Sequence, residues 1–141
     1  MKIEGVGVRE ITREFGTPVY VYSMATLRQS IDEIRQLSPV TRYAMKACSN
    51  VRILKEMLNH GIKIDAVSVH EVKRAIKAGF KSDDICFTSD VFSNLGDVFF
   101  CLENKIFTNC GTLGMLEEYG CAFEKNKQGS QKVSIRINPG E

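Results

Sequence analysis

The sequence predicts an α/β fold in which short parallel strands alternate with amphipathic helices. Strand-like segments rich in Val and Ile begin near residues 42, 63, 85, 105 and 133, so a strand recurs about every 22 residues apart from one longer step. This alternation is typical of parallel βαβ units. Two architectures fit it: a doubly wound sheet, and about five of the eight units of a (β/α)8 TIM-type barrel. No G-x-G-x-x-G motif follows any strand, so a dinucleotide-binding sheet has no support.

Composition indicates a globular protein and excludes several function classes. Of the 141 residues, 43% are hydrophobic and 26% are charged, which provides enough apolar material for a core. The net charge of +2 is too small to indicate nucleic-acid or membrane binding. The five cysteines form no C-x-x-C pair, and two histidines are too few for a His-rich metal site. We therefore expect a cytoplasmic protein with no metal ion, no nucleic-acid partner and no membrane segment.

The first part of the chain predicts a turn, a strand and a helix. Residues 15–18 (FGTP) are a turn signal, and Val19–Tyr22 is strand-like by composition. Ser23 is a typical helix N-cap. An apolar stripe at helical spacing follows, formed by Leu27, Ile31, Ile34 and Leu37.

Capping residues mark the start of each helix in the repeating part. Ser68 and Glu71 have the S-x-x-E spacing of a capping box. The polar segment 124–131 is interpreted as a loop before the last strand. The residues expected to open the four helices are Asn50, Ser68, Ser93 or Asn94, and Thr112.

A lysine interrupts the first strand of the repeat. Residues 42–48 (RYAMKAC) are interpreted as one strand, in which alternation places Lys46 on the same face as Ala44 and Cys48. Small neighbours leave room beside the amine for a large group. A lysine shielded from water can attack a carbonyl and form a Schiff base. The simpler interpretation is a lysine that faces solvent on an edge strand.

Further charges and polar groups lie towards the ends of the strands. Asp65 and Arg136, like Lys46, are charged residues in otherwise apolar strands, while Ser68 and Glu71 follow the second strand. In a barrel, the chemistry gathers at the C-terminal ends of the strands, so these residues are candidates for a small-ligand site. Each also has a structural interpretation. Ser68 and Glu71 could be a capping box alone, Asp65 could pair with a lysine, and Arg136 could point outward.

Several of these segments, in this order, match one family. The chain resembles the N-terminal part of the diaminopimelate decarboxylases, within the alanine-racemase-like (fold type III) group of pyridoxal-phosphate enzymes. The resemblance runs from about residue 15 to residue 140. It rests on F-G-T-P-V-Y-V-Y at 15–22, Y-A-M-K-A at 43–47, D-A-V-S at 65–68 with Glu71, F-T at 87–88 and R-I-N-P at 136–139.

The resemblance implies a cofactor, a reaction and site residues. Lys46 would carry pyridoxal 5'-phosphate covalently, and Asp65, Ser68, Glu71 and Arg136 would be cofactor-binding positions. The implied reaction is decarboxylation of meso-2,6-diaminopimelate to L-lysine and CO2, the last step of lysine biosynthesis, in a homodimer. The sequence departs from the family at Val69-His70, where two glycines are usual.

The resemblance also implies a domain organisation. Residues 1–24 would be a segment whose strand joins a C-terminal β-domain, and residues 25–141 would be the first part of the cofactor-binding barrel. The chain then corresponds to the N-terminal part of a longer protein and is expected to be inactive alone. Two alternatives stay open: another fold type III enzyme, such as a basic amino acid decarboxylase or a racemase, and a non-enzymatic barrel that carries the cofactor.

Overall fold

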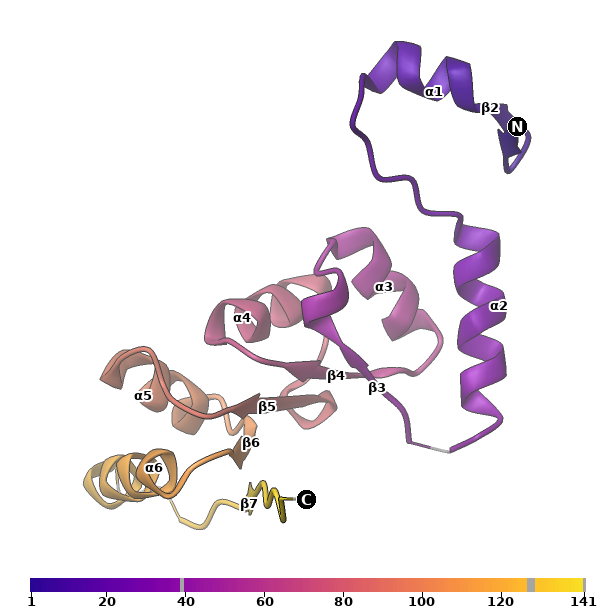
Figure 1. Cartoon of the computed structure of the whole chain (residues 1–141). Helices are drawn as coiled ribbons and strands as arrows, with labels where there is room; N and C mark the ends of the chain where they lie inside the picture. Colours follow the sequence, from indigo (N-terminus) through magenta and orange to yellow (C-terminus); the bar gives the residue numbers. More distant parts are fainter. Residues whose placement is uncertain (39, 127–128, 141) are drawn as a thin grey trace. The chain divides into compact units, whose positions relative to one another are not determined.

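The computed structural model describes residues 1–38, 40–126 and 129–140. The chain forms two compact units, Met1–Pro39 and Val40–Glu141 (Figure 1). The predicted domain boundary after residue 24 differs from this division and stays a prediction.

The first unit contains a small hairpin and two helices. Strand β1 (Lys2–Ile3) pairs antiparallel with β2 (Val6–Gly7), and helix α1 (Val8–Phe15) follows directly. Helix α2 (Met24–Arg35) begins as predicted, because the Ser23 hydroxyl accepts a hydrogen bond from the Thr26 amide at 3.1 Å. The sequence reading missed the hairpin and α1.

Two expectations for this unit are wrong. Val19–Tyr22 belongs to no strand of the described residues, and its four side chains are exposed by 39% to 90%. A β-strand is defined by its pairing with a neighbouring strand, and the two described strands of this unit, β1 and β2, pair with each other. In the expected stripe of α2, Ile31 is buried, but Ile34 and Leu37 are exposed by 47% and 85%. A join with a β-domain remains a prediction for this segment.

The second unit is a five-stranded parallel sheet with an α-helix between each pair of successive strands (Figure 1). The strand order is β3-β4-β5-β6-β7, so every strand pairs with the next one in the sequence. A doubly wound sheet reverses its order at a switch point, whereas a barrel does not. The order therefore confirms the predicted partial barrel. The strands are β3 (Arg42–Ala44), β4 (Lys63–Ala66), β5 (Ile85–Ser89), β6 (Phe107–Cys110) and β7 (Val133–Ile135).

The predicted caps open the helices between the strands. Asn50 accepts from the Arg52 amide at 2.9 Å, Asn94 from the Asp97 amide at 3.1 Å, and Thr112 from the Met115 amide at 3.1 Å. The helices are α3 (Val51–Asn59), α4 (Val69–Ala78), α5 (Leu95–Glu103) and α6 (Leu113–Asn126), with 3-10 turns η1 (Met45–Ala47) and η2 (Ser82–Asp84).

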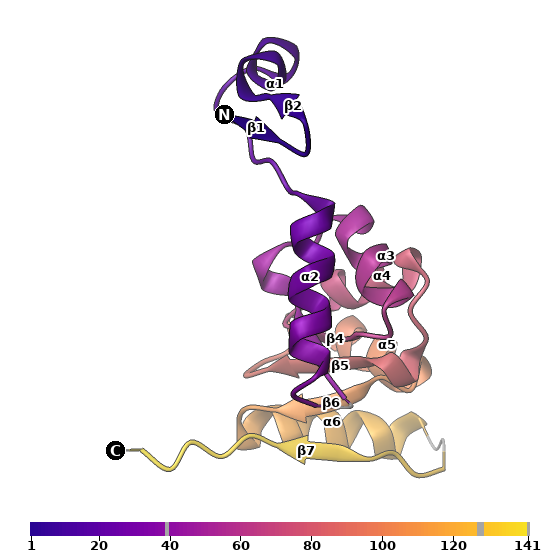
Figure 2. The same ribbon diagram turned by 90° about the vertical axis from the view of Figure 1, so that its right-hand side faces the viewer.

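The two faces of this sheet differ in polarity. In-register residues of parallel strands point to the same side, and one side is apolar and buried. That side includes Ile64, Ile85 and Phe87, each at most 2% exposed, and it packs on α4 and α6. The other side carries half-buried polar residues near the ends of β4 to β7, strands that follow one another in Figure 2. These polar residues are Asp65, Thr88, Asn109 and Ser134.

Two element boundaries differ from the sequence reading. Strand β6 begins at Phe107, because Lys105 has a φ of +53° and cannot lie in a strand. Helix α6 continues to Asn126, so the expected loop at 124–131 starts later. Residues 127 and 128 of that loop lie outside the described residues.

Candidate active site at the C-terminal ends of the strands

Lys46 lies in a turn rather than in the predicted seven-residue strand. Strand β3 ends at Ala44, and Lys46 is the middle residue of η1. The turn is held on both sides: the Met45 side chain is 1% exposed, and the Tyr43 hydroxyl donates to the Cys48 carbonyl at 3.0 Å. Burial raises the pKa of Tyr43, so its phenol stays protonated and able to donate. The Lys46 side chain itself is exposed.

Asp65 lies on the strand next to the lysine-bearing turn. Its register partner is Ala44, so Lys46 comes two residues beyond that pair. The Thr88 hydroxyl of β5 donates to the Asp65 Oδ1 at 2.7 Å, and the Thr88 Oγ1 also lies 3.6 Å from the Cys86 sulfur. Strands β4 and β5 therefore bring a carboxylate and a hydroxyl together on the polar face, and the lysine-bearing turn follows β3, the strand that pairs with β4.

Ser68 and Glu71 form the capping box that their spacing predicts. The Glu71 amide donates to the Ser68 hydroxyl at 3.2 Å, and the Val67 amide donates to the Glu71 carboxylate at 2.8 Å. Both side chains thus fix the start of α4 directly after β4. Their assignment as cofactor-binding residues stays a prediction.

Arg136 lies three strands away from Asp65, at the far side of the sheet. Its amide donates to the Cys110 carbonyl at 2.8 Å and extends the pairing of β6 with β7, while its side chain is exposed. It lines a hollow of about 450 Å³ together with Asp90, Gly111, Thr112 and Asn138. The structure therefore places Lys46 and Asp65 on adjacent elements and Arg136 apart from them.

Gly111 is required for the shape of this hollow. A Cβ at this position would collide with the Asp90 carboxylate and lie 2.8 Å from the Ser89 carbonyl oxygen. The Thr112 hydroxyl donates to the Asp90 carbonyl at 2.8 Å and ties the β5 exit to the start of α6. The sequence analysis predicted Thr112 as a helix cap but did not predict its contact with Asp90.

The sequence analysis also did not predict a second hydrogen-bonded pair on the polar face of the sheet. The Ser134 hydroxyl of β7 donates to the Asn109 Oδ1 of β6 at 2.9 Å, and the two residues are register partners. The signal was present in the sequence. Each of β4 to β7 carries a polar residue on the polar face near its end. Applying period-2 alternation to all the strands together would have identified these four residues.

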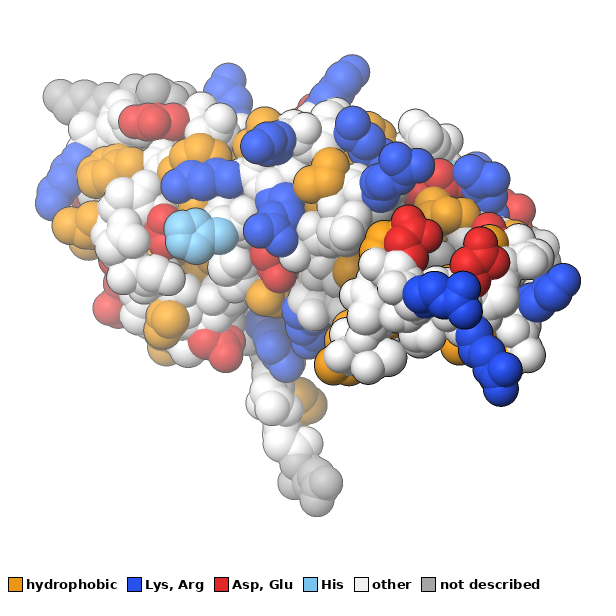
Figure 3. Space-filling model, turned by 90° about the horizontal axis from the view of Figure 1, so that it is seen from above, with side chains coloured by type: hydrophobic (Ala, Val, Ile, Leu, Met, Phe, Trp, Pro, Cys, Tyr) orange, Lys and Arg blue, Asp and Glu red, His pale blue; other side chains and the backbone are white. Residues whose placement is uncertain are grey.

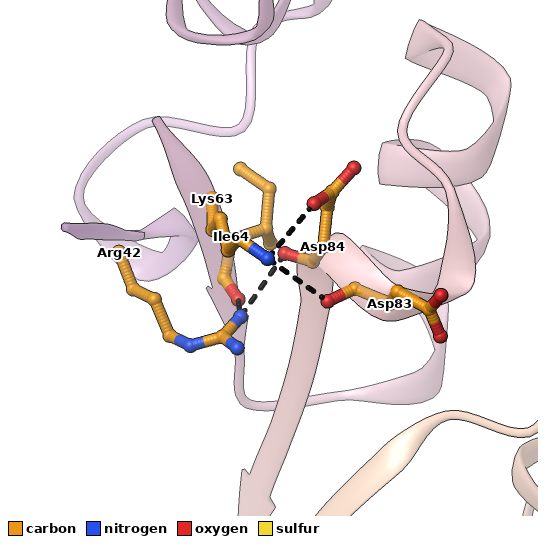
Figure 4. Close-up of polar contacts among 5 residues, drawn as sticks. All are labelled: Arg42, Lys63, Ile64, Asp83 and Asp84. Carbon is orange, nitrogen blue, oxygen red and sulfur yellow. Dashed lines mark hydrogen bonds and ion pairs between the residues drawn. The ribbon is translucent and has the colours of Figure 1, made fainter. Parts of the chain in front are cut away.

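The opposite, N-terminal end of the sheet holds a different set of charges (Figure 4). The Arg42 guanidinium donates from Nη1 to the carbonyl oxygens of Ile64 and Asp84, both at 3.1 Å. The Lys63 ammonium lies 3.1 Å from the Asp84 carboxylate and 3.4 Å from the Asp83 carbonyl oxygen. These contacts join the starts of β3, β4 and β5. The Arg42 and Lys63 side chains thus bond to atoms of the same chain.

The residues at the C-terminal end fit a polar cofactor that bears an aldehyde. Lys46 offers an amine for covalent linkage, the carboxylate of Asp65 is held on the neighbouring strand, and a guanidinium lies at the far side of the same end. The fold and this donor set are typical of one class, the barrel-type α/β proteins that bind a small polar ligand at the C-terminal ends of their strands.

Comparison with known proteins identifies the family within this class. Residues 24–141 match the family model described as pyridoxal-dependent decarboxylase, pyridoxal binding domain. The chain belongs to this family. The cofactor prediction is thereby confirmed, because the matched domain is a pyridoxal-binding domain.

Relatives and solved structures agree with this assignment. The chain is 39% identical over 142 residues to diaminopimelate decarboxylase of Streptomyces coelicolor, covering 98% of this chain and 31% of the relative. It is 38% identical over 131 residues to the Escherichia coli K12 enzyme of the same name, covering 90% and 30%. The Helicobacter pylori diaminopimelate decarboxylase structure, complexed with L-lysine, matches with a TM-score of 0.84 at 28% identity, over 94% of this chain and 34% of that one.

The chain thus spans about three tenths of the length of the curated relatives it matches. Among the described residues, no helix is both long and apolar enough to cross a membrane.

Proposed function

We propose that this chain is the cofactor-anchoring part of a pyridoxal-phosphate enzyme that decarboxylates meso-2,6-diaminopimelate to L-lysine and CO2. The observation that carries the proposal is the lysine-bearing turn η1 at the C-terminal end of β3, beside Asp65 on β4. The identity of 38–39% to enzymes named diaminopimelate decarboxylase supports the substrate. We further propose a cytoplasmic homodimer, as the resemblance implies.

The residues of the chain have distinct roles in this proposal. When bound, the cofactor supplies an electron sink for the pair released as CO2 departs. Lys46 would hold the cofactor through its Nζ, and its amine would be a group able to move a proton at the substrate. Asp65, oriented by Thr88, provides a carboxylate on the strand next to the lysine-bearing turn. Arg136 provides a guanidinium that can orient an anionic group from the far side of the site.

Two further residues contribute through the backbone. Ser68 and Glu71 fix the start of α4 next to Asp65, so the first amides of this helix are presented at the same end of the sheet. We propose that they line the cofactor site from this position.

Trapping of the cofactor tests the anchor. The chain is incubated with pyridoxal phosphate, reduced with borohydride and digested, and the labelled lysines are located by mass spectrometry. We expect the adduct to be concentrated at Lys46 and absent in Lys46→Ala, while Lys63→Ala, a lysine at the other end of the sheet, labels like the unaltered chain. Labelling spread evenly over the exposed lysines would contradict the assignment.

A further inference from the structure

A basic groove lies between α3 and α4, on the outer side of the second unit. It has a volume of about 660 Å³ and is lined by Ser49, Asn50, Val51, Arg52, Lys55, Lys73, Arg74 and Lys77. We call it the α3–α4 groove. Five of these eight residues are cationic, and none of the described residues that line the groove is acidic. Seen from above, the surface carries Lys and Arg side chains at many positions, with Asp and Glu side chains between some of them (Figure 3).

This concentration of like charge carries an electrostatic cost. Arg52 and Lys55 on α3 are three residues apart, and Lys73 and Lys77 on α4 are four apart, so each pair lies on one helix face. Like charges at these spacings destabilise a helix by roughly 0.2–0.5 kcal/mol per pair. The two helices also pack against each other, which adds repulsion between them. A bound anion would remove this repulsion.

Two of the five cations are held in place by neighbours. Arg74 donates from Nη1 to the Ser49 hydroxyl at 2.6 Å, which fixes its guanidinium over the start of α3. The Lys73 ammonium lies 4.8 Å from the centroid of the Phe100 ring, in a cation–π contact with α5. Side chains that are already ordered lose less entropy when a ligand binds, so the groove is partly preorganised.

The lining restricts the chemistry of the ligand. Proteins that bind single-stranded nucleic acid stack its bases on aromatic side chains, and none of the described lining residues is aromatic. The apolar contribution is the side chain of Val51, so an apolar ligand has little to contact. Guanidinium groups instead form paired hydrogen bonds with phosphate oxygens. We propose that the α3–α4 groove binds a compact anion that carries several phosphate groups.

The proposal is independent of the cofactor site, because it uses none of the residues assigned to that site. Inorganic triphosphate is the probe, titrated into the whole chain by calorimetry at low ionic strength. The test variant is Lys55→Gln with Lys77→Gln, and the matched control is Lys81→Gln with Lys125→Gln, which removes two exposed lysines elsewhere on the same unit. All four side chains are exposed, and circular dichroism checks that each variant keeps its helices.

The expected result is saturable binding that weakens about tenfold in the groove variant and less than about twofold in the control. Arg74→Lys keeps the charge but loses the paired geometry, so we expect about a threefold loss of affinity. Adenosine triphosphate should bind no more than about twofold more tightly than triphosphate, because the groove offers no stacking surface. Absence of binding, equal losses in the two double variants, or a strong preference for the nucleotide would overturn the proposal.

Discussion

The two ends of the parallel sheet use charge in opposite ways. At the N-terminal end, Arg42 and Lys63 direct their donors at carbonyl oxygens and at the Asp84 carboxylate of the same chain. At the C-terminal end, Lys46 and Arg136 extend exposed side chains towards solvent. Charges that are satisfied internally contribute to stability, whereas charges left exposed at strand ends are available to a ligand. Position along the strand, rather than charge itself, therefore separates the residues that stabilise the sheet from those that are available to a ligand.

The largest effect on stability is expected from Arg42→Ala. This change removes the donor shared by two carbonyl oxygens that connect β3 with β4 and with the start of β5. We expect the free energy of unfolding to fall by about 1–2 kcal/mol, measured by urea denaturation. The matched variant at the other end, Lys46→Ala, should change it by less than about 0.5 kcal/mol. Equal losses would remove the distinction between the two ends.

An intermediate loss of stability is expected from Thr88→Val. Thr88 lies at the C-terminal end of the sheet, but its side chain differs from those of Lys46 and Arg136. This hydroxyl is occupied within the chain, because it donates to Asp65. Valine keeps the shape but leaves the half-buried carboxylate without this donor, at a cost of about 1 kcal/mol. Thr88→Ser retains the donor and should recover most of that loss. In the cofactor-trapping assay, we expect Thr88→Val to reduce labelling of Lys46 more than Thr88→Ser does.

If Thr88→Val and Thr88→Ser were equally stable and labelled equally, the hydrogen bond would have no role in orienting Asp65. The pair would then be incidental to the site.

The smallest effect is expected from Lys63→Gln. Its ion pair with Asp84 is partly exposed, with side-chain accessibilities of 34% and 31%. Partly exposed pairs of this kind contribute about 0.5 kcal/mol and are screened by salt. The loss measured by urea denaturation should therefore be present at low salt and disappear at high salt. A loss that persists at high salt would mean that the bond to the Asp83 carbonyl dominates.

Much of the second unit could be predicted from the sequence because its signals are local. Asn50, Ser68, Asn94 and Thr112 cap helices where their spacing places them, and four of the five strands begin at the predicted residue. Lys105 shows where local pattern fails. Its apolar neighbours suggest a strand, but its left-handed backbone belongs to the end of the preceding helix. The secondary-structure propensities of the residues do not indicate a left-handed backbone conformation at a lysine.

The sequence indicated candidate residues for the site, whose roles stay predictions, and it did not indicate the contacts between them. Lys46 and Asp65 were found as charges in apolar strands, and the register places them on adjacent elements. The expected strand through Lys46 was wrong, because the Tyr43–Cys48 hydrogen bond closes a turn that depends on a side chain reaching five residues ahead. The Thr88–Asp65 bond joins residues 23 positions apart, and no local pattern specifies it.

The strand order has a consequence for how this sheet can form. Arg42 pairs with Lys63, Ile64 with Ile85, and Cys86 with Phe107, so each partner lies a constant 21 positions further along the chain. For β6 and β7 the separation is 25 positions, as between Thr108 and Val133, so all the loops to be closed are short and each strand of this sheet pairs with the next one in the sequence. Topologies of low contact order fold quickly. During synthesis, each newly emerged strand can dock on the edge left by the one before it, so the sheet can grow in the direction of translation.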